Sequence, residues 1–406
     1  MRIAVRNLNM SFKKAWYPIL AVIILLIAGI LYIHFTHYAP LDVPEGTEVE
    51  VWYAGDDCLW QSFGSLVDSY NTGDGEKYGI KVNAREFEDR AALYDAVDAA
   101  ADNNEALPDM LICDTDFAAY LYRGGRLAAI SDYFGQWEIS YIDDKFSDAA
   151  KCDDALVAVP VAAETGVFII NNRLYPVDEN LSFEKLCAMS DDYYAETGKS
   201  FYSISDYSQF FRTAMSQYSD SFDGVSPHDT KNNNCKYVYK HLAETAYNRS
   251  FMATGDSAAK YVAGGELACA VVMSSQVMEY RHLMNDGDIA FAAYPCVENG
   301  VQVCPELVVG ITMLAGSEAS QNASAMFIRW FTSDEVNGDF VGESGYLSAV
   351  GAMTEDSDDA VYKALTEAIR EQENGSTRLI YSADAQYSEN SRSFDAFLKT
   401  IMESFA

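Results

Sequence analysis

A single carboxylate lies between two strand-like apolar segments near the middle of the chain. Ala155–Val161 and Val167–Ile170 are apolar, and Glu164 and Gly166 stand in the short stretch that separates them. Glu residues are rarely fully buried unless they are paired. Because its neighbours are two alanines and a threonine, Glu164 has no evident structural duty, and we interpret it as a candidate for contacting a ligand.

Catalytic motifs are missing from the sequence. It contains no G-x-S-x-G, H-E-x-x-H, P-loop or G-x-G-x-x-G pattern. Three of the five histidines, His228, His241 and His282, are isolated, and the other two lie at the C-terminal end of an apolar segment near the N-terminus. With 61 acidic residues, a carboxylate pair for glycoside hydrolysis stays open as an alternative. We therefore predict that the protein is not an enzyme and needs no cofactor, with a surface hydrolase as the alternative.

Eight cysteines follow the N-terminal apolar segment. Cys296 and Cys304 lie symmetrically around Glu298–Val301, a plausible hairpin tip, so they form a candidate disulfide. The remaining cysteines show no pattern, and without C-x-x-C or a close Cys/His cluster a metal site is not expected.

The charge of the chain excludes some partners. The first 35 residues carry +4 and the remainder −37, which together give the formal net charge of −33. Such a domain repels phosphate backbones, so we do not expect nucleic acid as a partner. Solubility explains the charge, and attraction of a cationic solute stays open.

The N-terminus resembles a membrane anchor. Trp16–Phe35 is uncharged and spans about 30 Å as a helix, the thickness of a bilayer core. Four basic residues and no acidic residue precede it, which predicts a cytoplasmic N-terminus and an extracellular remainder. The alternative is a cleaved signal peptide, but no A-x-A-like site is clearly placed.

The elements that would position Glu164 alternate between strand and helix. Strand-like segments are "EVEVWYAG", "GIKVNAREF" and "PDMLICD", each followed by a helix-like segment. After the stretch around Glu164 come mostly helices, with strand-like "ELACAVVM" and "DIAFAAYP", and then the helix "NASAMFIRWFTSDEV". This alternation indicates parallel strands covered by helices, and the length favours two lobes.

Five segments, in this order, carry a resemblance to a known family. They are "VWYAGDD", "LPDMLICDTDFAAYLYRGGRLAAISDYF", "VAVPVAAETGVFIINNRLY", "YVAGGELACAVVMSS" and "FAAYPC". Over residues 48–350 the chain resembles the extracellular solute-binding proteins of ATP-driven importers, the group that includes maltose-binding protein. In this resemblance the third and fifth segments correspond to the two crossings between lobes.

The resemblance implies an α/β fold of the two-lobe periplasmic-binding-protein type II (Venus flytrap) class, and the uncharged segment 16–35 places an N-terminal transmembrane helix before it. We expect a cytoplasmic N-terminus over 1–15, the anchor over 16–35 and a linker over 36–46. Lobe 1 is then 47–160 plus 295–340, and lobe 2 is 161–294 plus 341–406. Ligands of open α/β sheets bind at strand ends near a crossover, and Gly166 could assist hinge closure.

The resemblance also implies the residues that contact a ligand. One alternative is structural, because Trp52 could be core and Asp56 and Asp116 could be helix caps. The sequence also departs from the family: it lacks the lipid-bearing Cys (Ile30 stands there), a tryptophan near Ser274 and a proline in the late loop. The candidates are Trp52, Tyr53, Asp56, Asp116, Glu164, Ser274, Ser275, Gln276 and Tyr346.

The predicted function is that of a membrane-anchored extracellular solute-binding protein. It would capture a small solute by lobe closure, preferably a carbohydrate, and deliver it to the permease subunits of an ABC importer. A ligand-sensing or scaffold domain of the same fold is the alternative. The acidic candidates suit a polyhydroxyl solute and also a cation.

Overall fold

The computed structural model describes residues 41–142, 144–176, 181–218, 233–252, 254, 258–342, 344–349, 359–375 and 377–380. The predicted anchor at 16–35 and the part of the predicted lobe 2 after residue 380 lie outside these residues. No helix within the described residues is both long and apolar enough to cross a membrane.

Within the described ranges, ten strands form one sheet whose main path runs β2-β1-β3-β10-β6-β8-β7, with β9 and β11 on β6 and β12 on β10. A separate hairpin pairs β4 with β5. The strands are β1 Thr47–Ala54, β2 Ile80–Phe87, β3 Met110–Asp114, β4 Lys151–Cys152, β5 Ala155–Leu156, β6 Val159–Asn171, β7 Ser200–Ile204, β8 Leu267–Met273, β9 Ile289–Ala292, β10 Val303–Met313, β11 Leu347–Ser348 and β12 Thr377–Ile380.

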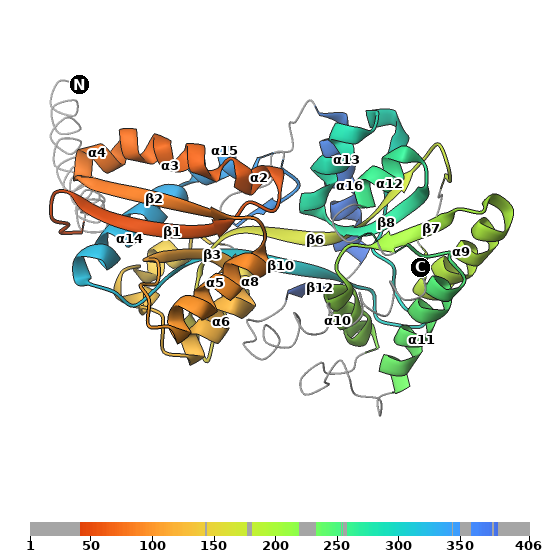
Figure 1. Cartoon of the computed structure of the whole chain (residues 1–406), viewed down its shortest axis with the longest axis horizontal. Helices are drawn as coiled ribbons and strands as arrows, with labels where there is room; N and C mark the ends of the chain where they lie inside the picture. Colours follow the sequence, from red (N-terminus) through yellow and green to blue (C-terminus); the bar gives the residue numbers. More distant parts are fainter. Residues whose placement is uncertain are drawn as a thin grey trace, which may run out of the picture. The chain divides into compact units, whose positions relative to one another are not determined.

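Helices cover both faces of this sheet (Figure 1). The α-helices are α2 Cys58–Gln61, α3 Phe63–Thr72, α4 Asp74–Tyr78, α5 Arg90–Asp102, α6 Thr115–Arg123, α7 Gln136–Ile139, α8 Asp144–Ala149, α9 Phe183–Thr197, α10 Tyr207–Gln217, α11 Asn233–Tyr247, α12 Ala258–Gly264, α13 Val277–Leu283, α14 Glu318–Phe331, α15 Asp334–Val341 and α16 Ala360–Gly375, and the short 3-10 helices are η1 Ile130–Asp132, η3 Ser274–Gln276 and η4 Asp286–Asp288.

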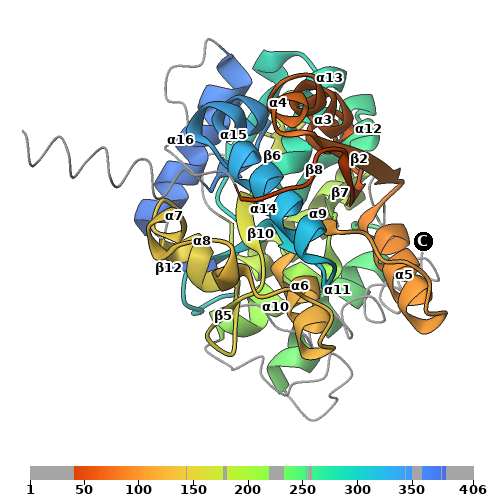
Figure 2. The same cartoon turned by 90° about the vertical axis from the view of Figure 1, so that its left-hand side faces the viewer.

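The first lobe is built on the parallel strands β1, β2 and β3, with β10 antiparallel beside β3. Alternation along β1 sends Trp52 into a core with α5 and α6, while Tyr53 packs on Phe63 of α3. Phe63 in turn contacts Phe331 of α14. The two helical layers therefore lie on opposite faces of the sheet, as the views of Figures 1 and 2 show for α3 and α5.

The second lobe has its own core around β7, β8 and the end of β6. Phe168 of β6, Phe183 of α9 and Phe210 of α10 belong to this cluster of buried side chains. Because each lobe buries its own apolar face, the two-lobe α/β architecture expected from the sequence is confirmed.

Strand β6 joins the two lobes. Its first part, Val159–Thr165, pairs with β10, and its last part, Gly166–Asn171, pairs with β8 and β9. All thirteen residues of β6 are buried. Glu164 therefore lies directly before the point where the strand passes from one lobe to the other.

The second crossing differs from the prediction. The segment "FAAYPC" contains only β9 and the residues after it, and β9 pairs with β6. The strand that runs beside β6 in the first lobe is β10, which starts at Val303, and sequence analysis did not predict it. Pro305 and Gly310 interrupt the strand-like character of its sequence, which explains the omission.

The predicted hairpin between Cys296 and Cys304 does not form, and no disulfide joins them. Strand β9 ends at Ala292 and pairs with β6 rather than β10, so the two cysteines are not held opposite each other. Instead the Cys296 thiol lies 3.4 Å from the carbonyl oxygen of Val301, and that of Cys304 lies 3.8 Å from Thr165 Oγ1. A turn at Val297–Gly300 is nevertheless present.

Candidate functional site

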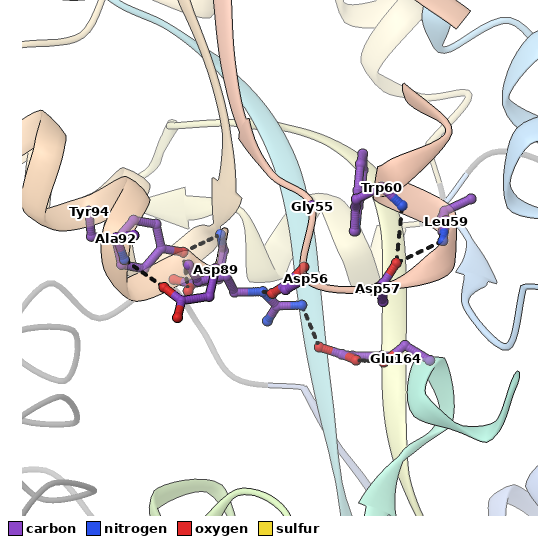
Figure 3. Close-up of polar contacts among 12 residues, drawn as sticks. Gly55, Asp56, Asp57, Leu59, Trp60, Asp89, Ala92, Tyr94 and Glu164 are labelled. Atoms are coloured by element: carbon purple, nitrogen blue, oxygen red, sulfur yellow. Dashed lines mark hydrogen bonds and ion pairs between the residues drawn. The ribbon is translucent and has the colours of Figure 1, made fainter. Parts of the chain in front are cut away.

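The loop after β1 places two adjacent carboxylates at the strand's carboxyl end. Asp57 is the N-cap of α2, and its Oδ1 accepts hydrogen bonds from the backbone N–H groups of Leu59 and Trp60 at 2.9 and 3.0 Å (Figure 3). Asp56 is therefore not the cap, and its carboxylate is directed to Arg90, with 3.1 Å between Oδ2 and Nε.

Arg90 is the first residue of α5, directly after the N-cap Asp89. The Asp89 carboxylate accepts from the N–H of Ala92 at 2.7 Å, which fixes the start of the helix (Figure 3). One turn later, the hydroxyl of Tyr94 donates a short hydrogen bond to Asp114 of β3. The cap and this bond hold α5 in place, so the backbone that carries the Arg90 side chain is fixed.

Glu164 accepts hydrogen bonds from both lobes. Its Oε1 lies 3.1 Å from Nη2 of Arg90 in the first lobe. Its Oε2 accepts a short hydrogen bond from the hydroxyl of Ser275, which belongs to η3 in the second lobe. The Glu164 side chain is only 3% exposed, and such a buried carboxylate is stable only with partners of this kind. Glu164 thus links the lobes at the strand that crosses between them.

Tyr346 adds a contact from the late loop. Its hydroxyl donates to Oδ2 of Asp57 at 2.6 Å and accepts from Nε1 of Trp60 at 3.1 Å and from Nη2 of Arg90 at 3.3 Å. The preceding Gly345 has φ +87°, and a Cβ there would lie 2.2 Å from the carbonyl oxygen of Ser274. This glycine allows the loop that carries Tyr346 to approach η3 closely.

We call Asp56, Asp57, Arg90, Glu164, Ser275 and Tyr346 the hinge network. Burial opposes the charge of Arg90, but the carboxylates of Asp56 and Glu164 outweigh burial and raise its pKa above the ordinary value. Burial raises the pKa of Asp57, an effect that the Tyr346 hydroxyl partly offsets. One cation therefore faces three carboxyl groups in a hydrogen-bonded cluster of which Glu164, Ser275 and Tyr346 are buried.

A second contact joins the lobes away from the hinge network. Asp116 lies in the first turn of α6, but the N-cap of that helix is Asp114. The Asp116 carboxylate instead forms an ion pair with Arg212 of α10 at 3.2 Å, and their side chains are 4% and 8% exposed. Asp116 is thus a lobe-to-lobe contact rather than the cap considered from the sequence.

The other predicted candidates make contacts within the protein, with Gln276 half-buried and the rest buried. Trp52 belongs to the core of the first lobe, and the Tyr53 hydroxyl donates to Glu86 at 3.1 Å. Ser274 Oγ accepts from the N–H of Thr165 at 3.1 Å, and Gln276 Oε1 accepts from the N–H of Met273 at 3.2 Å. These contacts position β6 and η3, so these residues support the hinge network and do not join it.

Four participants were not predicted from the sequence: Asp57, Arg90, Trp60 as a donor, and Arg212. Arg90 did leave a signal, since a cation in the first turn of a helix opposes the helix dipole and needs another reason to be there. Trp60 lies in the four-residue helix α2 and Arg212 in the amphipathic helix α10, and no sequence pattern distinguishes them. Among the described residues, no group of His, Cys, Asp and Glu side chains is arranged to hold a metal ion.

Solved structures of sugar-binding proteins share this fold. The GacH receptor of Streptomyces glaucescens, solved free and with acarbose, matches with a TM-score of 0.70 at 15% identity over 88% of this chain and 94% of that one. The cyclic α-maltosyl-1,6-maltose binding protein of Arthrobacter globiformis matches with a TM-score of 0.64 at 17% identity over 89% and 94%.

A third similar structure is the substrate-binding protein Lmo0181 of Listeria monocytogenes in complex with cycloalternan, with a TM-score of 0.69 at 12% identity over 89% and 95% of the two chains. At these identities the likeness establishes the fold, which confirms the two-lobe class predicted from the sequence. No curated protein is significantly similar in sequence.

The family model "Bacterial extracellular solute-binding protein" matches residues 65–368, which is most of the chain and includes most of the hinge network. This family and the similar structures consist of binding proteins and not of enzymes. The chain belongs to the bacterial extracellular solute-binding protein family.

Proposed function

We propose that this protein captures a carbohydrate between its two lobes and delivers it to the permease of an ABC importer. One observation carries the proposal: Glu164, on the strand that crosses between the lobes, is bonded from both of them, by Arg90 and by Ser275. A ligand that engages this carboxylate would act on both lobes together, and its preference for one arrangement would shift their equilibrium.

The chemistry of the hinge network suits a polyhydroxyl solute. Sugar hydroxyls both donate and accept hydrogen bonds, and carboxylates beside a guanidinium offer both functions within a few ångströms. The indole of Trp60 and the ring of Tyr346, which meet edge to face at 6.1 Å, are buried beside these groups and help to hold them in place. The sugar ligands named for the similar structures point in the same direction.

Within this proposal we assign the contact residues more narrowly than the sequence allowed. Asp56, Arg90, Glu164, Ser275 and Tyr346 would contact the solute or hold the groups that do. Asp116 and Arg212 would act in closure. Trp52, Tyr53, Ser274 and Gln276 would stabilise the lobes from inside, since their polar contacts are internal or their rings belong to a core.

Binding is tested by isothermal titration calorimetry of residues 41–406 with malto-oligosaccharides, cyclic glucans and other neutral sugars. We expect saturable one-to-one binding of at least one of them. Glu164→Gln should weaken it about tenfold or more, because a hydrogen bond to a charged group is worth about 1.5–3 kcal/mol. The exposed Glu196→Gln is the matched control and should bind like the wild type. No binding to any sugar would contradict the proposal.

We further propose that 16–35 anchors the protein in the cell membrane as a single pass, with the binding domain outside. The support is its length, its lack of charge and the basic residues before it. In membrane fractions the full chain should resist extraction by high salt, whereas protein starting at residue 41 should be released. Protease added to intact cells should remove the domain; protection from protease would contradict the proposed orientation.

A further inference from the structure

The hinge network contains a cation that belongs to the protein itself. The Arg90 side chain is 28% exposed. Its guanidinium bridges two carboxylates, with Nε paired to Asp56 and Nη2 paired to Glu164. The two carboxylates come from separate elements, the loop after β1 and the crossing strand β6. A bridging guanidinium therefore occupies the position at which a cationic group of a ligand would be bound.

This position is costly for the helix that provides the cation. The first residue of an α-helix lies at the positive end of the helix dipole, where a cation is unfavourable. The first turn of α5 contains no acidic residue, and the N-cap Asp89 before it offsets only part of the dipole. The contacts with Asp56, Glu164 and the Tyr346 hydroxyl must outweigh this cost.

The negative charge of the whole chain explains why a cation matters at the position of Arg90. The whole chain carries a net charge of −33, and a field of this sign concentrates cations near the protein. Without Arg90, Asp56 and Glu164 would lose the guanidinium that bridges them, and the negative charge of the hinge network would increase by one. Closely spaced carboxylates attract ammonium groups, and the Arg90 guanidinium already occupies that place.

We propose that Arg90 is a specificity-determining residue that excludes cationic solutes from the hinge network and leaves it selective for neutral, hydroxyl-bearing ones. The inference rests on the proposed function for the identity of the accepted solute. It adds the class of solute that is rejected and the residue that rejects it. Arg90 acts by pairing with both Glu164 and Asp56, which partly compensates their charge and leaves their oxygens as acceptors for hydroxyl groups.

The test uses spermidine as the probe and calorimetry at low and high salt as the measurement. The wild-type protein should show no saturable one-to-one binding of spermidine in the micromolar range. Arg90→Gln should bind spermidine at least about tenfold more tightly than the wild type, and the gain should shrink at high salt. Adding Glu164→Gln to that variant should remove the gain, because the number of uncompensated carboxylates returns to that of the wild type.

Arg173→Gln is the matched control, since it removes one positive charge from an exposed side chain that pairs with Asp288. It should bind spermidine like the wild type. Equal spermidine affinity for R90Q and R173Q would overturn the proposal. Micromolar binding of spermidine by the wild type would overturn it as well, and this measurement does not depend on whether R90Q folds.

The outcome is separable from that of the proposed function. If no sugar binds but R90Q gains spermidine binding that R173Q lacks, the carbohydrate assignment fails and the role of Arg90 stands. If sugars bind and R90Q gains nothing, the role of Arg90 fails and carbohydrate capture stands.

Discussion

The packing of Tyr53 in the first lobe changes the pKa of its side chain. Tyr53 is buried between β1 and α3, where it donates to Glu86 and contacts the ring of Phe63. Burial, together with the nearby Glu86 carboxylate, raises the pKa of Tyr53 to about 12 from its ordinary value near 10. The folded protein thus keeps the phenol protonated at a pH where the unfolded chain has lost that proton.

This difference predicts an alkaline effect on stability. Because the pKa is raised on folding, the contribution of Tyr53 is complete below about pH 10 and is lost as the pH rises towards 12. Wild type should exceed Tyr53→Phe by about 1 kcal/mol in free energy of unfolding at pH 7. The margin should shrink between about pH 10 and 12 in urea titrations. A margin that stays constant over this range would contradict the assignment.

The elements around β6 are held by very close packing. A Cβ on Gly166 would lie 2.4 Å from the ring of Tyr294 and 2.5 Å from Cγ of Pro305. The carbonyl oxygen of Gly166 also accepts from Nε2 of Gln372 at 3.0 Å, which ties α16 to the crossing strand. The hinge region therefore has no room for a side chain at this position.

Gly166→Ala should accordingly destabilise the protein by about 1–3 kcal/mol, the usual cost of overpacking a well-packed interior. Gly338→Ala is the control, since Gly338 lies inside α15 with no atom within 4 Å of its added Cβ. That change should be neutral or stabilise the protein by up to about 1 kcal/mol. Chemical unfolding of the two variants measures both effects, and equal midpoints would contradict the packing argument.

At this scale the sequence predicted local elements better than distant pairings. Strands β1, β2 and β3 and their helices follow from alternating patterns within about 70 residues. Strand β10 does not, because Pro305 and Gly310 weaken its pattern and its partners β3 and β6 lie far away in the chain. The same holds for the site, where Glu164 was predicted from its unusual neighbours, whereas Arg90 gains its role only through residues brought together by folding.

For the whole molecule, the Asp116–Arg212 pair connects helices of different lobes. Breaking a buried ion pair by removing one partner costs about 3–5 kcal/mol if the other charge stays buried. Lobe opening would let that charge reach water. The pair should therefore favour the arrangement in which α6 and α10 are in contact.

Arg212→Gln should shift the ligand-free protein towards a more open arrangement, seen as a larger radius of gyration in small-angle X-ray scattering. A bound sugar should reverse the shift. Lys240→Gln on α11 removes a charge from an exposed pair with Glu244 and should leave the scattering unchanged. Identical curves for the Arg212 variant and the wild type would show that the ion pair does not control lobe closure.

The pairing of β3 with β10 affects how the chain is made as well as how it works. Asp114 pairs with Val309, about 200 residues later in the sequence. At a synthesis rate of about 5–20 residues per second, the ribosome needs roughly 10–40 s to produce the partner strand. During that interval β3 has an unpaired edge, which is a point of attachment for other chains. Newly made protein should accordingly depend on chaperones over this window.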